Sequence, residues 1–121
     1  MMVAFLHDRL AGAALLFFAA AAVWGLVSHL RRRGMGPEYW GILAIGELLI
    51  LAQGLLGAAL WLGGDRPARG IHILYGVVAV ITLPAYYAYT KGQDNRRAAL
   101  NYGLICLFLV AIAFRAATTA R

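Results

Sequence analysis

Residues 10–30 read LAGAALLFFAAAAVWGLVSHL, a stretch without a single Asp, Glu, Lys or Arg. A helix needs roughly 20 apolar residues to cross the hydrocarbon core of a bilayer. Three further runs of similar length, at 40–62, 70–90 and 98–117, are also largely apolar, and only short connections separate them. Because short connections make neighbouring helices antiparallel, the sequence predicts an all-α integral membrane protein. Residues 1–121 would form one domain, a four-transmembrane-helix bundle of up-down-up-down topology.

The composition supports this fold class and narrows the function. Hydrophobic residues make up 63% of the chain and charged residues 13%, with a net charge of +6. We ascribe the positive charge to contact with anionic lipids, because no aromatic and basic platform for nucleic acid is present. The single cysteine, Cys106, excludes an intramolecular disulfide and a multi-cysteine metal site. We expect it to serve as a small packing residue.

The distribution of basic residues predicts the orientation. Six cluster in two connections, namely Arg31, Arg32, Arg33, Lys91, Arg96 and Arg97. The others are scattered toward the opposite end, at Arg9, Arg66, Arg69, Arg115 and Arg121. Positively charged connections stay in the cytoplasm, so both termini should face outward across a bacterial inner membrane. The sequence also predicts a belt of interfacial aromatic residues at the cytoplasmic end, formed by Trp40, Tyr86, Tyr87, Tyr89 and Tyr102.

Two of the three histidines should lie at the same depth. The first and third helices of this topology run parallel, and His7 and His72 lie near the start of each. His29 is roughly 33 Å farther along the first helix than His7, so the two cannot share one ligand. Two imidazoles on facing helices can be the axial ligands of haem b. The alternative is that each histidine anchors its helix at the membrane interface.

Small and basic residues near the histidines fit a haem site. Ala11 and Ala14 lie one and two turns inward from His7, and Gly76 and Ala79 follow His72 in the same way. These four residues would leave a slot for a porphyrin, although small residues also serve ordinary helix packing. The basic residues that could pair with haem propionates are Arg9, Arg69 and Arg115, together with Arg66. The same side chains could instead be interfacial anchors.

Three segments carry a resemblance to a known family. Residues 6–12 read LHDRLAG, 53–58 read QGLLGA and 72–76 read HILYG. In order and spacing these segments resemble one four-helix half of the haem A synthase family. Each half of that family has histidines at a shared depth on two parallel helices, with a Gln-x-x-Leu-Gly-like segment on the helix between them. The resemblance covers about three helices and implies that His7 and His72 bind haem. Small haem b membrane cytochromes have a similar arrangement.

The chain also departs from this family. Haem A synthases have two such halves, and this chain has one. Asp8 separates His7 from Arg9 where the family typically has His-Arg, and Val3 replaces a Glu one turn before the histidine. Because that carboxylate and the second half are missing, we expect a haem-binding scaffold without synthase activity.

A separate candidate site is the carboxylate inside the second apolar run. Glu47 lies roughly 10 Å inside the cytoplasmic interface, a depth at which an ionisable group is costly and often functional. A neutral acid there could relay a proton or bind a quinol hydroxyl. Thr82, Tyr86 and Tyr102 are its candidate partners. The alternative is a protonated Glu that only holds helices together, and Gln53 is open to the same two interpretations.

These observations favour a small membrane protein that binds haem b. It would transfer electrons, or hold haem, beside a larger respiratory or photosynthetic membrane complex. The alternative is a cofactor-free accessory subunit or assembly factor of such a complex. A transporter is disfavoured, because the chain lacks an internal repeat and a path lined by polar residues. The expected partners are therefore the lipid bilayer and another membrane protein, without nucleic acid.

Overall fold

The computed structural model describes residues 2–67 and 69–119, and the regular structure within them is entirely helical. The helices are α1 (Met2–Leu30), α2 (Pro37–Leu62), α3 (Ile71–Thr90) and α4 (Arg96–Thr119). All four are long and apolar enough to cross a membrane, which confirms the prediction of four long apolar helices and is consistent with a multi-pass membrane protein. Helix α1 begins well before the apolar run at 10–30, so His7 lies within a helix.

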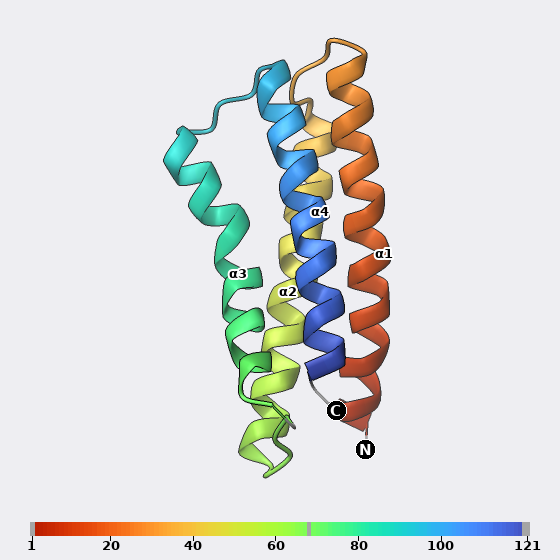
Figure 1. The fold of residues 1–121 in the computed structure, drawn as a ribbon, viewed down its shortest axis with the longest axis vertical. Helices are drawn as coiled ribbons and strands as arrows, with labels where there is room; N and C mark the ends of the chain where they lie inside the picture. The colour runs from red at the N-terminus through yellow and green to blue at the C-terminus, as the bar shows by residue number, and fades with distance from the viewer. Residues whose placement is uncertain (1, 68, 120–121) are drawn as a thin grey trace.

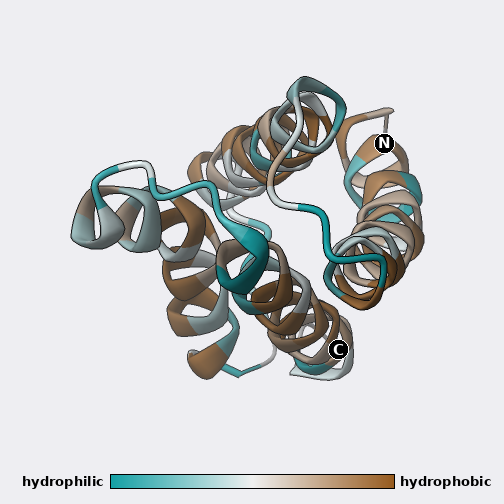
Figure 2. Ribbon diagram, turned by 90° about the horizontal axis from the view of Figure 1, so that it is seen from above, coloured by the Kyte–Doolittle hydropathy of each residue, from teal (hydrophilic) through white to brown (hydrophobic). Residues whose placement is uncertain are grey.

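The connections divide between the two ends of the molecule (Figure 1). The start of α1, the end of α4 and the connection between α2 and α3 lie at one end, which we call the terminal end. The connections α1–α2 and α3–α4 lie at the other, which we call the arginine end. A backbone hydrogen bond of 2.8 Å from Met35 N to Asp94 O joins these two connections. Viewed from above the arginine end, hydrophilic residues lie mainly in the connections and hydrophobic residues along the helices (Figure 2).

Helices α1 and α4 pack closely because glycine and alanine line their contact. A Cβ atom at Gly25 would lie 2.8 Å from the Ala99 carbonyl oxygen and 2.8 Å from the Gly103 Cα. A Cβ atom at Gly103 would in turn lie 3.2 Å from the Ala22 carbonyl oxygen. Without a hydrophobic effect to join helices in lipid, such close backbone packing is a main source of helix association.

The core is built mainly by α1, α2 and α4. Phe18 of α1 is 1% exposed and lies over Gly46 of α2, where a Cβ atom would be 2.8 Å from its ring. The Tyr39 hydroxyl donates a hydrogen bond of 2.9 Å to the Ala21 carbonyl oxygen. This bond satisfies a buried polar group and joins α2 to α1. Cys106 is buried and free, as expected for a packing residue.

Aromatic residues near the arginine end pack against one another inside the bundle. Tyr102 lies with its ring centre 5.3 Å from that of Trp40 and 5.0 Å from that of Tyr86. The prediction of an interfacial belt is wrong for Tyr102, which is 1% exposed, whereas Tyr89 is 85% exposed. Edge-to-face packing of the rings accounts for this burial.

Helix α3 is the least embedded of the four. Of its described residues only Leu83 is buried, and Val77 and Ile81 are more than half exposed. The helix leans away from the others toward the arginine end (Figure 1). Pro84 lies inside it and cannot donate a backbone hydrogen bond to the preceding turn. Most of α3 is therefore not covered by the rest of the bundle.

Candidate cofactor site

The structure brings His7 and His72 together at the terminal end. Their ring centres are 6.3 Å apart, and the ring planes meet at 75°. His7 comes from α1 and His72 from α3. Both of these helices pack against α2 and α4, so they lie diagonally opposite each other in the bundle. The two imidazoles thus meet across the bundle from non-adjacent helices. His29 lies at the other end of α1, apart from this pair.

A backbone carbonyl fixes the orientation of the His72 ring. The Nδ1 atom lies 2.7 Å from the Ala116 carbonyl oxygen of α4. Since a carbonyl oxygen can only accept, Nδ1 must carry the hydrogen and donate it. The lone pair of the neutral ring is then on Nε2. Histidines that bind metal ions commonly make this kind of second hydrogen bond, which fixes the tautomer and the ring orientation.

The His7 ring lies against α2. A Cβ atom at Gly57 would be 3.4 Å from the His7 Cε1, so this glycine lets the ring approach the helix backbone. Gln53, one turn away on the same face of α2, lies beside the ring. The Gln53 Oε1 and the His7 Nδ1 are both buried without a hydrogen-bond partner. Two polar atoms are thus buried where the His7 ring meets α2.

The spacing of the rings fits two axial ligands of one iron. With iron to nitrogen bonds of about 2 Å, the two ligating nitrogens are about 4 Å apart and the ring centres roughly 6 Å apart. The observed 6.3 Å agrees with this separation. The same distance also lies within the range of an ordinary edge-to-face pair of rings. The His72 hydrogen bond and the unpaired His7 nitrogen are therefore needed as further evidence. They bear on which nitrogen of each ring could bind iron, and the distance between the ring centres does not.

Two glycines one turn inward from the histidines, Gly54 and Gly76, lie on the exposed surface of their helices. A Cβ atom at Gly76 of α3 or at Gly54 of α2 would meet no atom within 4 Å. Of the alanines expected to line a slot, Ala11 and Ala79 are partly buried and Ala14 is 6% exposed. Gly76 thus lies on the open surface of α3, whereas Ala14 packs inside the bundle.

The arginines expected near haem propionates lie at the terminal end and are exposed. Arg9 extends over the Phe5 ring, with its guanidinium carbon 5.4 Å from the ring centre. Arg69 donates a backbone hydrogen bond of 3.2 Å to the Thr119 carbonyl oxygen. Arg115 precedes Ala116, the hydrogen-bond acceptor of His72. All three are thus close in the chain to the histidine pair or its partner, with side chains that solvent or headgroups can reach.

Glu47 is a separate feature of the bundle. It lies two turns from Trp40 on the same side of α2, roughly 15 Å along the helix from Gly57, which contacts His7. Its Oε1 is buried and has no hydrogen-bond partner among the described residues. Of the expected partners, Thr82 donates to Val78 O instead, and Tyr86 accepts from Asn101. The structure does not join Glu47 to the histidine pair.

Within the described residues, no group of three or more His, Cys, Asp or Glu side chains could hold a metal ion. A bis-imidazole haem needs only two such side chains, since the porphyrin supplies the other ligands. Comparisons with models of known protein families, with curated proteins and with solved structures found no match to this chain. The function is therefore inferred from the residues of this chain.

Proposed function

We propose that this chain is a small membrane protein that binds haem b between His7 and His72. It transfers electrons, or holds haem, beside a larger respiratory or photosynthetic complex, and it has no synthase activity. The observation that carries this proposal is the 6.3 Å spacing of two imidazoles from diagonally opposite helices. The resemblance to one half of a haem A synthase supports the same assignment.

The chain's own residues have defined tasks in this proposal. His72 donates from Nδ1 to the Ala116 carbonyl oxygen and thereby keeps the lone pair of Nε2 free to bind iron. His7 is held against Gly57, with Gln53 beside it as the natural acceptor for its Nδ1 hydrogen. Gly76 is exposed one turn from His72 and has no side chain to block a flat macrocycle. When bound, a haem with two imidazole ligands accepts and returns one electron.

The proposal includes insertion into a bacterial inner membrane. The four helices cross the bilayer in an up-down-up-down topology, with both termini outside and the arginine end in the cytoplasm. Support comes from the length of the four helices and from the two clusters of basic residues, Arg31 to Arg33 and Lys91 to Arg97. The histidine pair then lies near the outer surface, within reach of an extracytoplasmic electron partner.

One observation favours a second candidate function. Helix α3 exposes a row of apolar residues, including Ile73, Leu74, Val77 and Ile81. A cofactor-free accessory subunit or assembly factor could pack this row against a helix of a larger complex. In that case the histidines form an edge-to-face pair without iron.

A reduced-minus-oxidised absorption spectrum distinguishes the two functions. The protein is purified in detergent from cells supplied with a haem precursor, and the spectrum is recorded before and after dithionite. We expect the sharp bands of a low-spin haem b. His7→Ala and His72→Ala should each abolish these bands, because either change removes one strong axial ligand.

His29→Ala is the matched control, since His29 lies on α1 but at the arginine end. It removes a hydrogen bond to the Arg96 carbonyl oxygen and should leave the spectrum unchanged. Circular dichroism and gel filtration establish that each variant is folded. A folded wild-type protein without haem bands, or bands that survive both histidine variants, would refute the haem proposal and leave the accessory subunit.

A further inference from the structure

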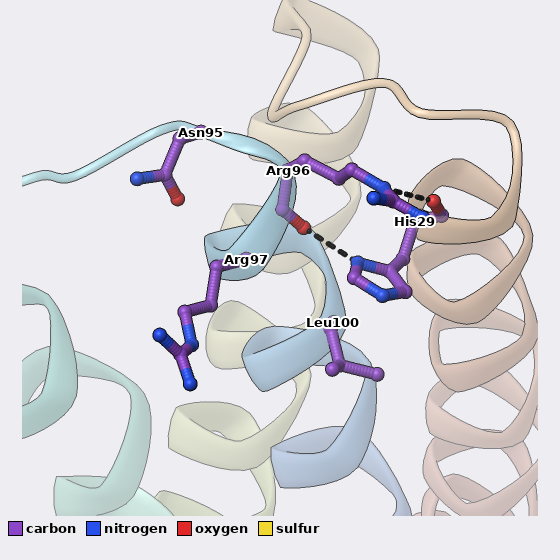
Figure 3. Close-up of a pocket in the computed structure, with 5 residues that line it drawn as sticks. All are labelled: His29, Asn95, Arg96, Arg97 and Leu100. Carbon is purple, nitrogen blue, oxygen red and sulfur yellow. Dashed lines mark hydrogen bonds between the residues drawn. The ribbon is translucent and has the colours of Figure 1, made fainter.

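A cavity lies at the arginine end of the molecule, apart from the histidine pair. It has a volume of about 480 Å³ and opens to the surface. Figure 3 shows the residues that line it, which are His29 of α1, Asn95 from the α3–α4 connection, and Arg96, Arg97 and Leu100 of α4. The two arginines give this cavity a positively charged lining, although the apolar Leu100 belongs to it as well.

Two hydrogen bonds hold this lining in place. The His29 Nδ1 donates to the Arg96 carbonyl oxygen at 3.0 Å, and the Arg96 Nε donates to the His29 carbonyl oxygen at 2.7 Å (Figure 3). This reciprocal pair joins the end of α1 to the start of α4. The terminal nitrogens of Arg96 and the His29 Nε2 are not used in these two bonds. The cavity wall is therefore organised before any ligand arrives.

The cavity lies beside the start of α4, where backbone N–H groups lack partners within the helix. The Asn95 Oδ1 accepts a hydrogen bond of 2.9 Å from Ala98 N, which caps the helix. The backbone N–H groups of Arg96 and Arg97 lie in the first turn, where a helix offers them no acceptor of its own. Arg97 also lines the cavity, and its guanidinium has no hydrogen bond drawn to the other lining residues (Figure 3). Positive charge and helix dipole thus both favour an anion here.

An apolar stripe on α4 continues from this cavity. Beyond Leu100, the stripe consists of Leu104, Leu107 and Phe108, which are 48%, 46% and 47% exposed. Their spacing of three and four residues places them on one face of the helix. A cationic cavity at the end of an apolar helix face is complementary to a lipid, in which a charged headgroup is joined to acyl chains.

We propose that this cavity binds the phosphate of an anionic phospholipid, with an acyl chain along the α4 stripe. The proposal requires the helices to lie in a bilayer, but it is independent of haem. A zwitterionic lipid has the same phosphate, yet its positive headgroup would lie beside Arg96 and Arg97. Inorganic phosphate has the charge but cannot contact Leu100 and the stripe. Basic cavities between transmembrane helices commonly bind anionic headgroups in this way.

Native mass spectrometry of the purified protein in detergent tests this site. The probes are dioleoylphosphatidylglycerol and dioleoylphosphatidylcholine, which share their acyl chains and differ in headgroup charge, together with inorganic phosphate as competitor. Arg97→Gln removes a cavity charge without touching the bonds between His29 and Arg96. Arg31→Gln is the matched control, because it removes the same charge at the same end of the molecule and Arg31 does not line this cavity.

We expect phosphatidylglycerol to bind more tightly than phosphatidylcholine. Arg97→Gln should weaken phosphatidylglycerol binding about tenfold, as the loss of a charge-assisted hydrogen bond implies, and Arg31→Gln less than about threefold. Millimolar inorganic phosphate should displace little of the lipid. Equal binding of the two lipids, or equal effects of the two variants, would overturn the proposal. Displacement by phosphate alone would also overturn it and would identify a site for a soluble anion.

Discussion

The close contact between α1 and α4 makes a sharp prediction for Gly25→Ala. The added Cβ atom would lie 2.8 Å from both the Ala99 carbonyl oxygen and the Gly103 Cα, and it would also meet the Tyr39 hydroxyl. Both backbone atoms belong to a helix and cannot turn aside as a flexible side chain could. Either α4 must move away from α1 or the Tyr39 hydrogen bond to Ala21 must change.

The cost of this change follows from the distances. Carbon atoms in favourable contact are roughly 3.5 Å apart or more, so the helices must separate by at least about 0.7 Å. A gap of this size forfeits about a quarter of the dispersion energy along the contact, and overpacking in well-packed cores costs typically 1–3 kcal/mol. Alanine recovers up to about 1 kcal/mol through its higher helix propensity. We therefore expect Gly25→Ala to lower the free energy of unfolding by about 1–2 kcal/mol.

Gly12→Ala is the matched control on the same helix. A Cβ atom there meets nothing within 4 Å, so only the gain in helix propensity remains. Both variants can be compared with the wild-type protein by reversible unfolding with dodecyl sulfate in mixed micelles, followed by circular dichroism. If Gly25→Ala is as stable as Gly12→Ala, then α1 and α4 are farther apart at Gly25 than the 2.8 Å contact implies.

The other predictions concern the haem slot, the buried acid and the orientation. Gly76→Leu should keep the fold, because Gly76 is exposed, but should lower the haem content several-fold, because it adds a bulky side chain one turn from His72. Gly12→Leu should not lower it, and equal haem content in both variants would place the macrocycle elsewhere. Glu47→Gln should change stability by less than about 1 kcal/mol, because the amide has the shape of the carboxyl group and the buried Oε1 has no hydrogen bond to lose. A larger loss would show an ionised and paired carboxylate. For orientation, an impermeant thiol reagent on intact cells should label Gly70→Cys and not Gln93→Cys, and the reverse pattern would invert the topology.

The sequence predicted the helices well, because apolar runs long enough to span a bilayer leave little choice of structure. The residues 40–62 and 98–117 lie inside α2 and α4, as expected. It also predicted that His7 and His72 would lie close together, since parallel helices with histidines near their starts place them at one depth. Depth comes from counting residues along a helix and needs no knowledge of side-chain packing.

Other features depend on helix rotation, which the apolar pattern hardly encodes. The helices are apolar on nearly every side, so the sequence could not show that Tyr102 faces the core or that Ala14 packs inside the bundle. The hydrogen bond from His72 to the Ala116 carbonyl oxygen joins two elements through a backbone atom, and no residue type marks such an acceptor.

The haem content of the purified protein tests most directly whether His7 and His72 bind haem. The protein is saturated with hemin in detergent, unbound hemin is removed by gel filtration, and haem is measured against protein as the pyridine complex. We expect about one haem per chain for the wild-type protein and a loss of most of it in His72→Ala, because two axial histidines hold one iron. A folded wild-type protein that retains no more haem than His72→Ala would show that the histidine pair does not bind haem.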